Sequence, residues 1–136
     1  YEEAYGKYIW LKSGASLVIE HTEAMTVIDV NTGSVLKKKK QEDTLFYQIN
    51  REAAKEIARQ LRLRNISGII MIDFINMKDT AQKEKLLSLL DSECKKDRVH
   101  CNVIDMTALN LVEMTRSKVR KPLHEQIRSC MKNNRS

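Results

Sequence analysis

The chain has 136 residues and carries 24 Lys and Arg against 18 Asp and Glu, a formal net charge of +6. Its length suits one domain with a hydrophobic core. With 42% hydrophobic and 31% charged residues, it does not have the composition of a disordered chain. No apolar stretch is long enough to span a membrane, and no signal peptide opens the chain. Tyr1 in place of Met suggests a fragment of a longer protein.

The excess of positive charge favours a polyanionic partner, such as nucleic acid or acidic lipid. A solvated basic surface would give the same balance. Three cysteines, Cys94, Cys101 and Cys130, form an odd number without the spacing of a disulfide framework. This pattern favours a reducing compartment.

The first third of the chain predicts three strands, at residues 8–12, 17–20 and 25–31. In the first strand, Tyr8 and Trp10 alternate with Ile9, a pattern more typical of packing than of a base-stacking platform. A loop with four consecutive lysines, Lys37, Lys38, Lys39 and Lys40, follows the third strand.

A helix is predicted over residues 43–64, because apolar side chains recur every four residues from Leu45 to Leu61. Another face of this helix forms a basic ridge, which consists of Arg51, Lys55, Arg59 and Arg62 and continues to Arg64. Residues 69–75 are apolar except for Asp73 and predict a strand covered on both faces.

The remaining pattern predicts a helix over residues 80–96 with Asp79 as its N-cap, and strands at 99–106 and 111–114. Pro122 is expected to open a short C-terminal helix. Arg116, Lys118, Arg120 and Lys121 form a further basic cluster, for which RNA contact and a solubilising role both remain open.

These elements predict an α/β fold, a mixed sheet with a central βαβ unit at residues 25–75 and helices packed on it. Such a crossover is almost always right-handed and its strands are parallel. Asp29 and Asp73 then lie near the carboxyl ends of two parallel strands, where open α/β sheets bind ligands. An ionised carboxylate inside an apolar strand is costly unless something pairs with it.

Asn31 lies two residues after Asp29, so both side chains point to the same side of a strand. Two carboxylates and a carboxamide oxygen suit Mg²⁺ or Mn²⁺ better than zinc. Such an ion could polarise a phosphodiester. Two alternatives remain, that each Asp only caps a loop or that the pair belongs to a receiver-like phosphoacceptor site. The acidic pair expected after the first strand of a receiver domain is missing.

Four stretches of the chain resemble the ribonuclease E/G endoribonucleases. They are residues 19–33, which end in VIDVNTG, then NREAAKEIARQLRLRN at 50–65, GIIMIDFINM at 68–77 and LVEMTR at 111–116. The resemblance implies that residues 1–122 form the DNase I-like catalytic subdomain of that family. It also implies that Asp29 and Asp73 bind the metal, Mg²⁺ with Mn²⁺ able to substitute, and that Asn31 orients the attacking water or the scissile phosphate.

The resemblance further implies hydrolysis of single-stranded RNA in ribosomal and transfer RNA processing and in messenger decay. The expected setting is the bacterial cytoplasm, with a plastid as the alternative, and the full-length protein could be a homo-oligomer. Lysines 37–40, named above, together with Arg59, Arg62 and Arg64 are the candidates for RNA contact. A solvated helix face containing Glu52 and Glu56 is the alternative for the arginines.

The chain departs from the family pattern in two respects. It contains none of the S1, 5′-sensor and RNase H-like regions that the family carries upstream. Residues 123–136 lie near the family's Cys-Pro-x-Cys zinc link, but Asn133 stands where the second cysteine would follow Cys130, so a zinc link is unsupported. An RNA-binding or assembly module with little activity of its own is therefore the alternative function.

Overall fold

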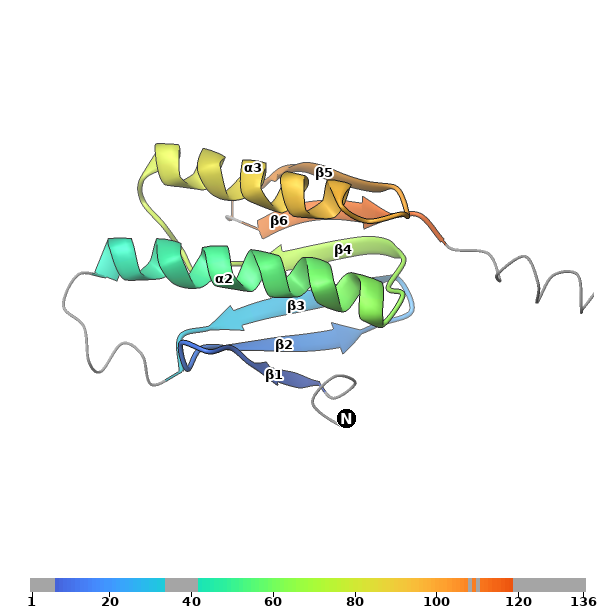
Figure 1. Cartoon of the computed structure of the whole chain (residues 1–136), viewed down its shortest axis with the longest axis horizontal. Coiled ribbons are helices and arrows are strands. Elements are labelled where there is room, and N and C mark those ends of the chain that lie inside the picture. The colour runs from blue at the N-terminus through green and yellow to red at the C-terminus, as the bar shows by residue number, and fades with distance from the viewer. Residues whose placement is uncertain (1–6, 34–41, 108, 110, 119–136) are drawn as a thin grey trace, which may run out of the picture.

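A computed structural model describes residues 7–33, 42–107, 109 and 111–118. Six strands form one sheet in the order β1-β2-β3-β4-β6-β5, with helices α2 and α3 packed on it (Figure 1). The elements are β1 Tyr8–Trp10, β2 Ser16–His21, β3 Met25–Asn31, α2 Glu42–Leu63, β4 Gly68–Asp73, α3 Thr80–Lys95, β5 Cys101–Met106 and β6 Leu111–Arg116. The predicted α/β class, mixed sheet and central βαβ unit are confirmed. The four lysines at 37–40 and the helix expected at Pro122 lie outside the described residues.

Only β3 and β4 pair in parallel, and every other neighbouring pair in the sheet is antiparallel. Helix α2 makes the crossover between them, beginning beyond the end of β3 and ending before the start of β4 (Figure 1). Asp79 caps α3 as predicted, accepting a hydrogen bond from the Ala81 N–H at 2.9 Å. Within the described residues, no helix is both long and apolar enough to cross a membrane.

Both helices cover the same face of the sheet, and they also pack against each other (Figure 1). The core lies between the two layers, where the alternate residues Ile28, Val30, Ile70 and Ile72 contact the apolar stripe of α2. Residues 69–75 were predicted to be covered on both faces, and this was wrong. Ile69 is 43% exposed and Asp73 is exposed, because no described element covers the second face of β4.

We call this uncovered side the open face of the sheet. It also carries Tyr8 and Trp10, which were predicted to pack and are instead 56% and 67% exposed. Their neighbour Ile9 is buried toward the helices, as the alternation along the strand predicts. The alternation does not predict whether a second layer covers the other face, and no described element covers it.

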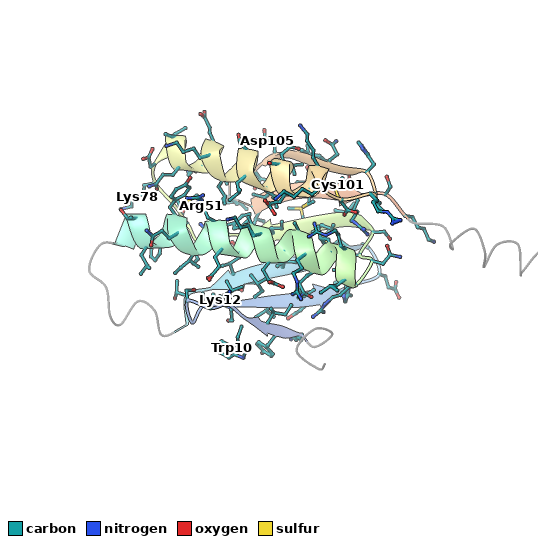
Figure 2. All side chains as sticks on the ribbon, in the orientation of Figure 1. Trp10, Lys12, Arg51, Lys78, Cys101 and Asp105 are labelled. Carbon is teal, nitrogen blue, oxygen red and sulfur yellow. The ribbon has the colours of Figure 1, made fainter. Side chains whose placement is uncertain are left out.

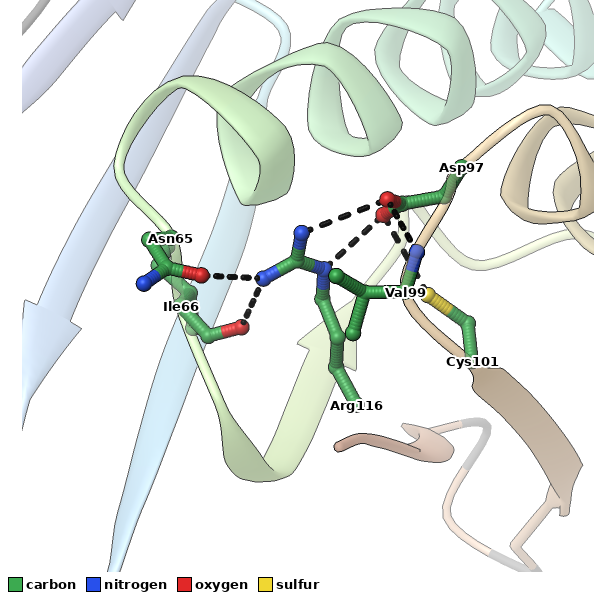
Figure 3. Close-up of polar contacts among 6 residues, drawn as sticks. All are labelled: Asn65, Ile66, Asp97, Val99, Cys101 and Arg116. Atoms are coloured by element: carbon green, nitrogen blue, oxygen red, sulfur yellow. Dashed lines mark hydrogen bonds and ion pairs between the residues drawn. The ribbon is translucent and has the colours of Figure 1, made fainter. Parts of the chain in front are cut away.

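Arg116, at the end of β6, is almost completely buried in an ion pair with Asp97 (Figure 3). Its Nε and Nη2 donate to the two carboxylate oxygens of Asp97 at 2.8 and 3.3 Å. Its Nη1 donates to Asn65 Oδ1 at 3.0 Å and to the Ile66 carbonyl at 2.9 Å. One guanidinium therefore joins β6 to the α2–β4 and α3–β5 connections, and neither role proposed for it, RNA contact or solubility, applies.

The carboxyl group of Asp97 is held ionised by this arrangement. Burial alone would raise the pKa of Asp97, but hydrogen bonds from Arg116 and from the Val99 N–H outweigh burial, and its pKa is lowered. The ionised form therefore stabilises the folded chain at pH values above the unfolded pKa of Asp, about 3.9. That contribution is lost as the pH falls through the lower pKa of the folded state.

Replacing Arg116 by Ala should lower the free energy of unfolding by about 3–5 kcal/mol, because it leaves the Asp97 carboxylate buried and unpaired. Chemical denaturation at neutral pH measures this loss. Lys95→Ala is the matched control, since Lys95 pairs with Asp91 on the exposed side of α3 and should cost about 1 kcal/mol or less. Equal losses in the two variants would contradict the structural role given to Arg116.

Candidate active site

Asp29 and Asp73 lie directly opposite each other on β3 and β4, as the last pair of the parallel register. Residues that pair in register point to the same face, and adjacent strands are about 4.8 Å apart. The sequence predicted that the two carboxylates share one edge of the sheet. The register brings them closer than that prediction required, because they are immediate neighbours.

Asn31 ends β3 and points to the same side as Asp29, since Val30 between them is buried in the core. Asp29 is half-buried, whereas Asp73 and Asn31 are exposed. The open face therefore presents two carboxylates and one carboxamide at the carboxyl ends of β3 and β4. These are hard oxygen donors, the kind that Mg²⁺ prefers.

The electrostatic setting of Asp29 is unfavourable for its charge. Its partial burial and then the neighbouring Asp73 carboxylate raise its pKa, while the Val30 N–H has the opposite effect. Among the described residues, no Lys, Arg or His forms an ion pair with Asp29 or Asp73. Two adjacent carboxylates without a cation are a place where a divalent ion would relieve the repulsion.

The described residues contain no group of three or more His, Cys, Asp and Glu arranged to hold a metal. Of the acidic side chains that the structure describes, an ion here would have only Asp29 and Asp73 as ligands. This suits Mg²⁺, which keeps several waters and often binds through one or two carboxylates together with substrate phosphate. A closed structural zinc site needs four protein ligands.

Asn50 on α2 fixes the chain that follows Asp73, and the sequence analysis missed it. Its side-chain Nδ2 donates to the Ile75 carbonyl at 2.8 Å, and its Oδ1 accepts from the Ile75 N–H at 3.0 Å. Asn50 is fully buried. The sequence did contain a sign of this role. Asn50 lies three and four residues before Ala53 and Ala54, so it belongs to the apolar side of α2. A polar group buried there needs a hydrogen-bond partner.

The predicted RNA-contact arginines lie away from the carboxylate pair. Arg59 and Arg62 belong to the second half of α2, and Arg64 follows its end, so all three lie toward the amino ends of β3 and β4 (Figure 1). Arg59 pairs with Glu56 at 2.9 Å, and Arg64 Nε donates to Gln60 Oε1 at 2.8 Å. The structure thus brings Asp29, Asn31 and Asp73 together but does not bring these arginines to them.

Comparisons with known proteins identify the family to which this chain is similar. The model of the Ribonuclease E/G family matches residues 1–119. Over 122 residues the chain is 45% identical to Ribonuclease G of Escherichia coli K12 and 47% identical to that of Haemophilus influenzae, in each case 90% of this chain and 25% of the relative. It is 41% identical to Ribonuclease E of a Nostoc species over 123 residues, 90% of this chain and 18% of the relative.

The chain thus spans a quarter or less of the length of these curated relatives. The match nevertheless includes all eight of the described helices and strands, and with them both carboxylates and Asn31. This chain belongs to the ribonuclease E/G family.

Proposed function

We propose that this chain is the catalytic part of a divalent-metal-dependent endoribonuclease, which hydrolyses phosphodiester bonds of single-stranded RNA. Membership of the ribonuclease E/G family supports an endoribonuclease function. The observation that carries the proposal is the register pairing of Asp29 with Asp73, next to Asn31, on the open face of the sheet. The biological role we propose is ribosomal and transfer RNA processing and messenger decay in the bacterial cytoplasm.

Asp29 and Asp73 would hold Mg²⁺, or Mn²⁺ in its place, and the ion would supply Lewis-acid stabilisation of charge on the scissile phosphate. Asn31 would orient the phosphate or the attacking water through its carboxamide. Asn50 would keep Asp73 in place by fixing the backbone two residues further along the chain. These roles divide binding, orientation and support among residues of β3, β4 and α2.

The alternative is an RNA-binding or assembly module with little activity of its own. It is favoured by the fact that the chain spans only a quarter or less of its curated relatives. Correct placement of the substrate supplies much of a catalytic rate, so regions outside the chain could contribute a large share of it.

Replacing Asp29 or Asp73 by Asn should reduce RNA cleavage in Mg²⁺ by about a hundredfold or more, because metal stabilisation of the transition state is worth several kcal/mol and about 1.4 kcal/mol is tenfold in rate. A gel assay with end-labelled single-stranded RNA measures the rate. Circular dichroism and chemical denaturation should show that both variants remain folded.

Asp105→Asn is the matched control, since Asp105 is an exposed carboxylate on β5, the strand at the opposite edge from β1. Its rate should equal that of the unchanged chain. Retained cleavage in both the Asp29 and Asp73 variants would refute the proposed site. If the unchanged chain binds RNA in a salt-sensitive manner and does not cut it, the binding-module alternative holds.

Metal binding should also change the titration of Asp29. Because Asp73 raises the pKa of Asp29, Asp73→Asn should lower that pKa, and Mg²⁺ should lower it in the unchanged chain by stabilising the carboxylate. Protons compete with the metal, so Mg²⁺ affinity should decrease as the pH falls through the raised pKa. Carboxyl ¹³C NMR across a pH series measures both effects. An Asp29 pKa that is the same with and without Mg²⁺ would argue against a metal at this pair.

A further inference from the structure

Two exposed aromatic side chains lie on the same face of the sheet as the carboxylate pair. Tyr8 and Trp10 are on β1, one of the two edge strands of the sheet, with 56% and 67% of their surfaces exposed. Trp10 projects from that edge (Figure 2). Within the described part of the chain, they are the only aromatic residues that are mainly exposed.

The strand register places both aromatic residues in line with the candidate active site. Trp10 pairs with Ser16, which pairs with Asn31. Tyr8 pairs with Val18, which pairs with Asp29 and, through it, with Asp73. Residues aligned in this way share a face, and two strand spacings amount to roughly 10 Å. Only Ser16 and Val18 lie between the aromatic residues and the site, and neither is large.

The hairpin that carries Trp10 is fixed to the rest of the molecule. In its turn, Ser13 donates hydrogen bonds from its N–H and its Oγ to the carboxylate of Glu52 on α2. The same turn approaches the end of β3 so closely that a Cβ on Gly33 would lie 2.5 Å from the Gly14 carbonyl oxygen. Gly33 also has a φ of +61°, a conformation that favours glycine. Trp10 therefore has a defined position relative to Asn31.

The ring of Trp10 has space for a ligand and positive charge nearby. No cation lies over its ring among the described residues, whereas Lys7 lies 5.9 Å from the centre of the Tyr8 ring. A groove of about 430 Å³ runs from Trp10, at the β1 edge, to α2 on the helix-covered side of the sheet, and it is lined by Lys12, Lys55 and Arg59 among others. Glu52 and Glu56 in the groove are engaged by Ser13 and by Arg59 and Gln60. Lys12 and Lys55 have no ion-pair partner among the described residues.

We propose that Trp10, assisted by Tyr8, stacks the bases of single-stranded RNA next to the scissile phosphate, and that Lys12 and Lys55 contact the backbone of the strand as it leaves the site. An exposed aromatic ring beside unpaired cations is the usual means of binding single strands, because every base offers a flat face for stacking. Double-stranded RNA keeps its bases stacked on each other, so the subsite selects single strands. This inference rests on the proposed function, since it assigns a substrate to the same face.

Trp10 is the only tryptophan of the chain, so its fluorescence reports on the subsite directly. The whole chain carrying Asp73→Asn, without divalent metal, should be titrated with a single-stranded ten-nucleotide RNA of mixed A and U. Stacking should quench the fluorescence in a saturable manner. Inorganic polyphosphate has the charge of RNA but no bases, and it should cause no comparable quenching. Equal quenching by RNA and polyphosphate would overturn the stacking role, and so would the absence of quenching by RNA.

Trp10→Ala should weaken binding of the same RNA about fivefold to a hundredfold, the range measured for loss of one base–aromatic stack. Trp10→Phe should recover most of the affinity. Ile104→Ala is the matched control, because Ile104 is 50% exposed on β5 at the opposite edge of the sheet. Binding can be followed by anisotropy of a labelled RNA.

Salt separates the two kinds of contact. The loss caused by Trp10→Ala should persist as ionic strength rises, whereas the loss caused by Lys12→Ala or Lys55→Ala should shrink, because phosphate contacts release counterions. If Trp10→Ala binds RNA as tightly as the unchanged chain, the subsite is refuted.

Failure of the subsite can be distinguished from failure of the proposed function. Cleavage that depends on Asp29 and Asp73 but not on Trp10 would leave the endoribonuclease proposal standing and remove the subsite. Quenching and weakened binding without any cleavage by the unchanged chain would support the stacking role and count against catalysis by this chain.

Discussion

The parallel pairing of β3 with β4 is the constraint on which the candidate site depends. Each strand alone would place one carboxylate in an apolar run, and only the register makes Asp29 and Asp73 immediate neighbours. Helix α2 makes the parallel pairing possible, since parallel strands need a crossover connection and this helix forms it. The same helix supplies Asn50, whose carboxamide holds the chain beyond Asp73. The βαβ unit that brings the two aspartates together therefore also contains the residue that supports Asp73.

The opposite end of the sheet is held together by different chemistry. There, Arg116 is buried with Asp97 and also hydrogen-bonds to Asn65 and the Ile66 carbonyl (Figure 3). A buried charge with a full set of partners fixes the relative position of three chain segments, at the cost of removing two ions from water. The structure thus separates a stabilised end from an end where two like charges are close together without a cation from the described residues.

Much of the fold could be predicted from the sequence, because the apolar periodicity of α2 and the uninterrupted run before Asp73 are strong patterns. The crossover rule then predicted that the two aspartates would lie at one edge. Contacts between distant residues could not be predicted in this way. Arg116 appeared to belong to a basic surface cluster, and only the tertiary structure brings Asp97 to it. Trp10 appeared to be a core residue, since periodicity identifies a face without showing what covers it.

The open face of the sheet has a consequence for how fast ligands can exchange. No described segment lies over Asp29 and Asp73, so within the described residues an ion or a strand can reach them without a loop or lid first moving. As far as the described residues determine it, access is governed by diffusion and by the local field, which the two carboxylates make attractive to cations and repulsive to phosphate. A divalent ion bound beforehand would neutralise the two carboxylates and so remove the repulsion that the phosphates of an RNA strand would otherwise meet there.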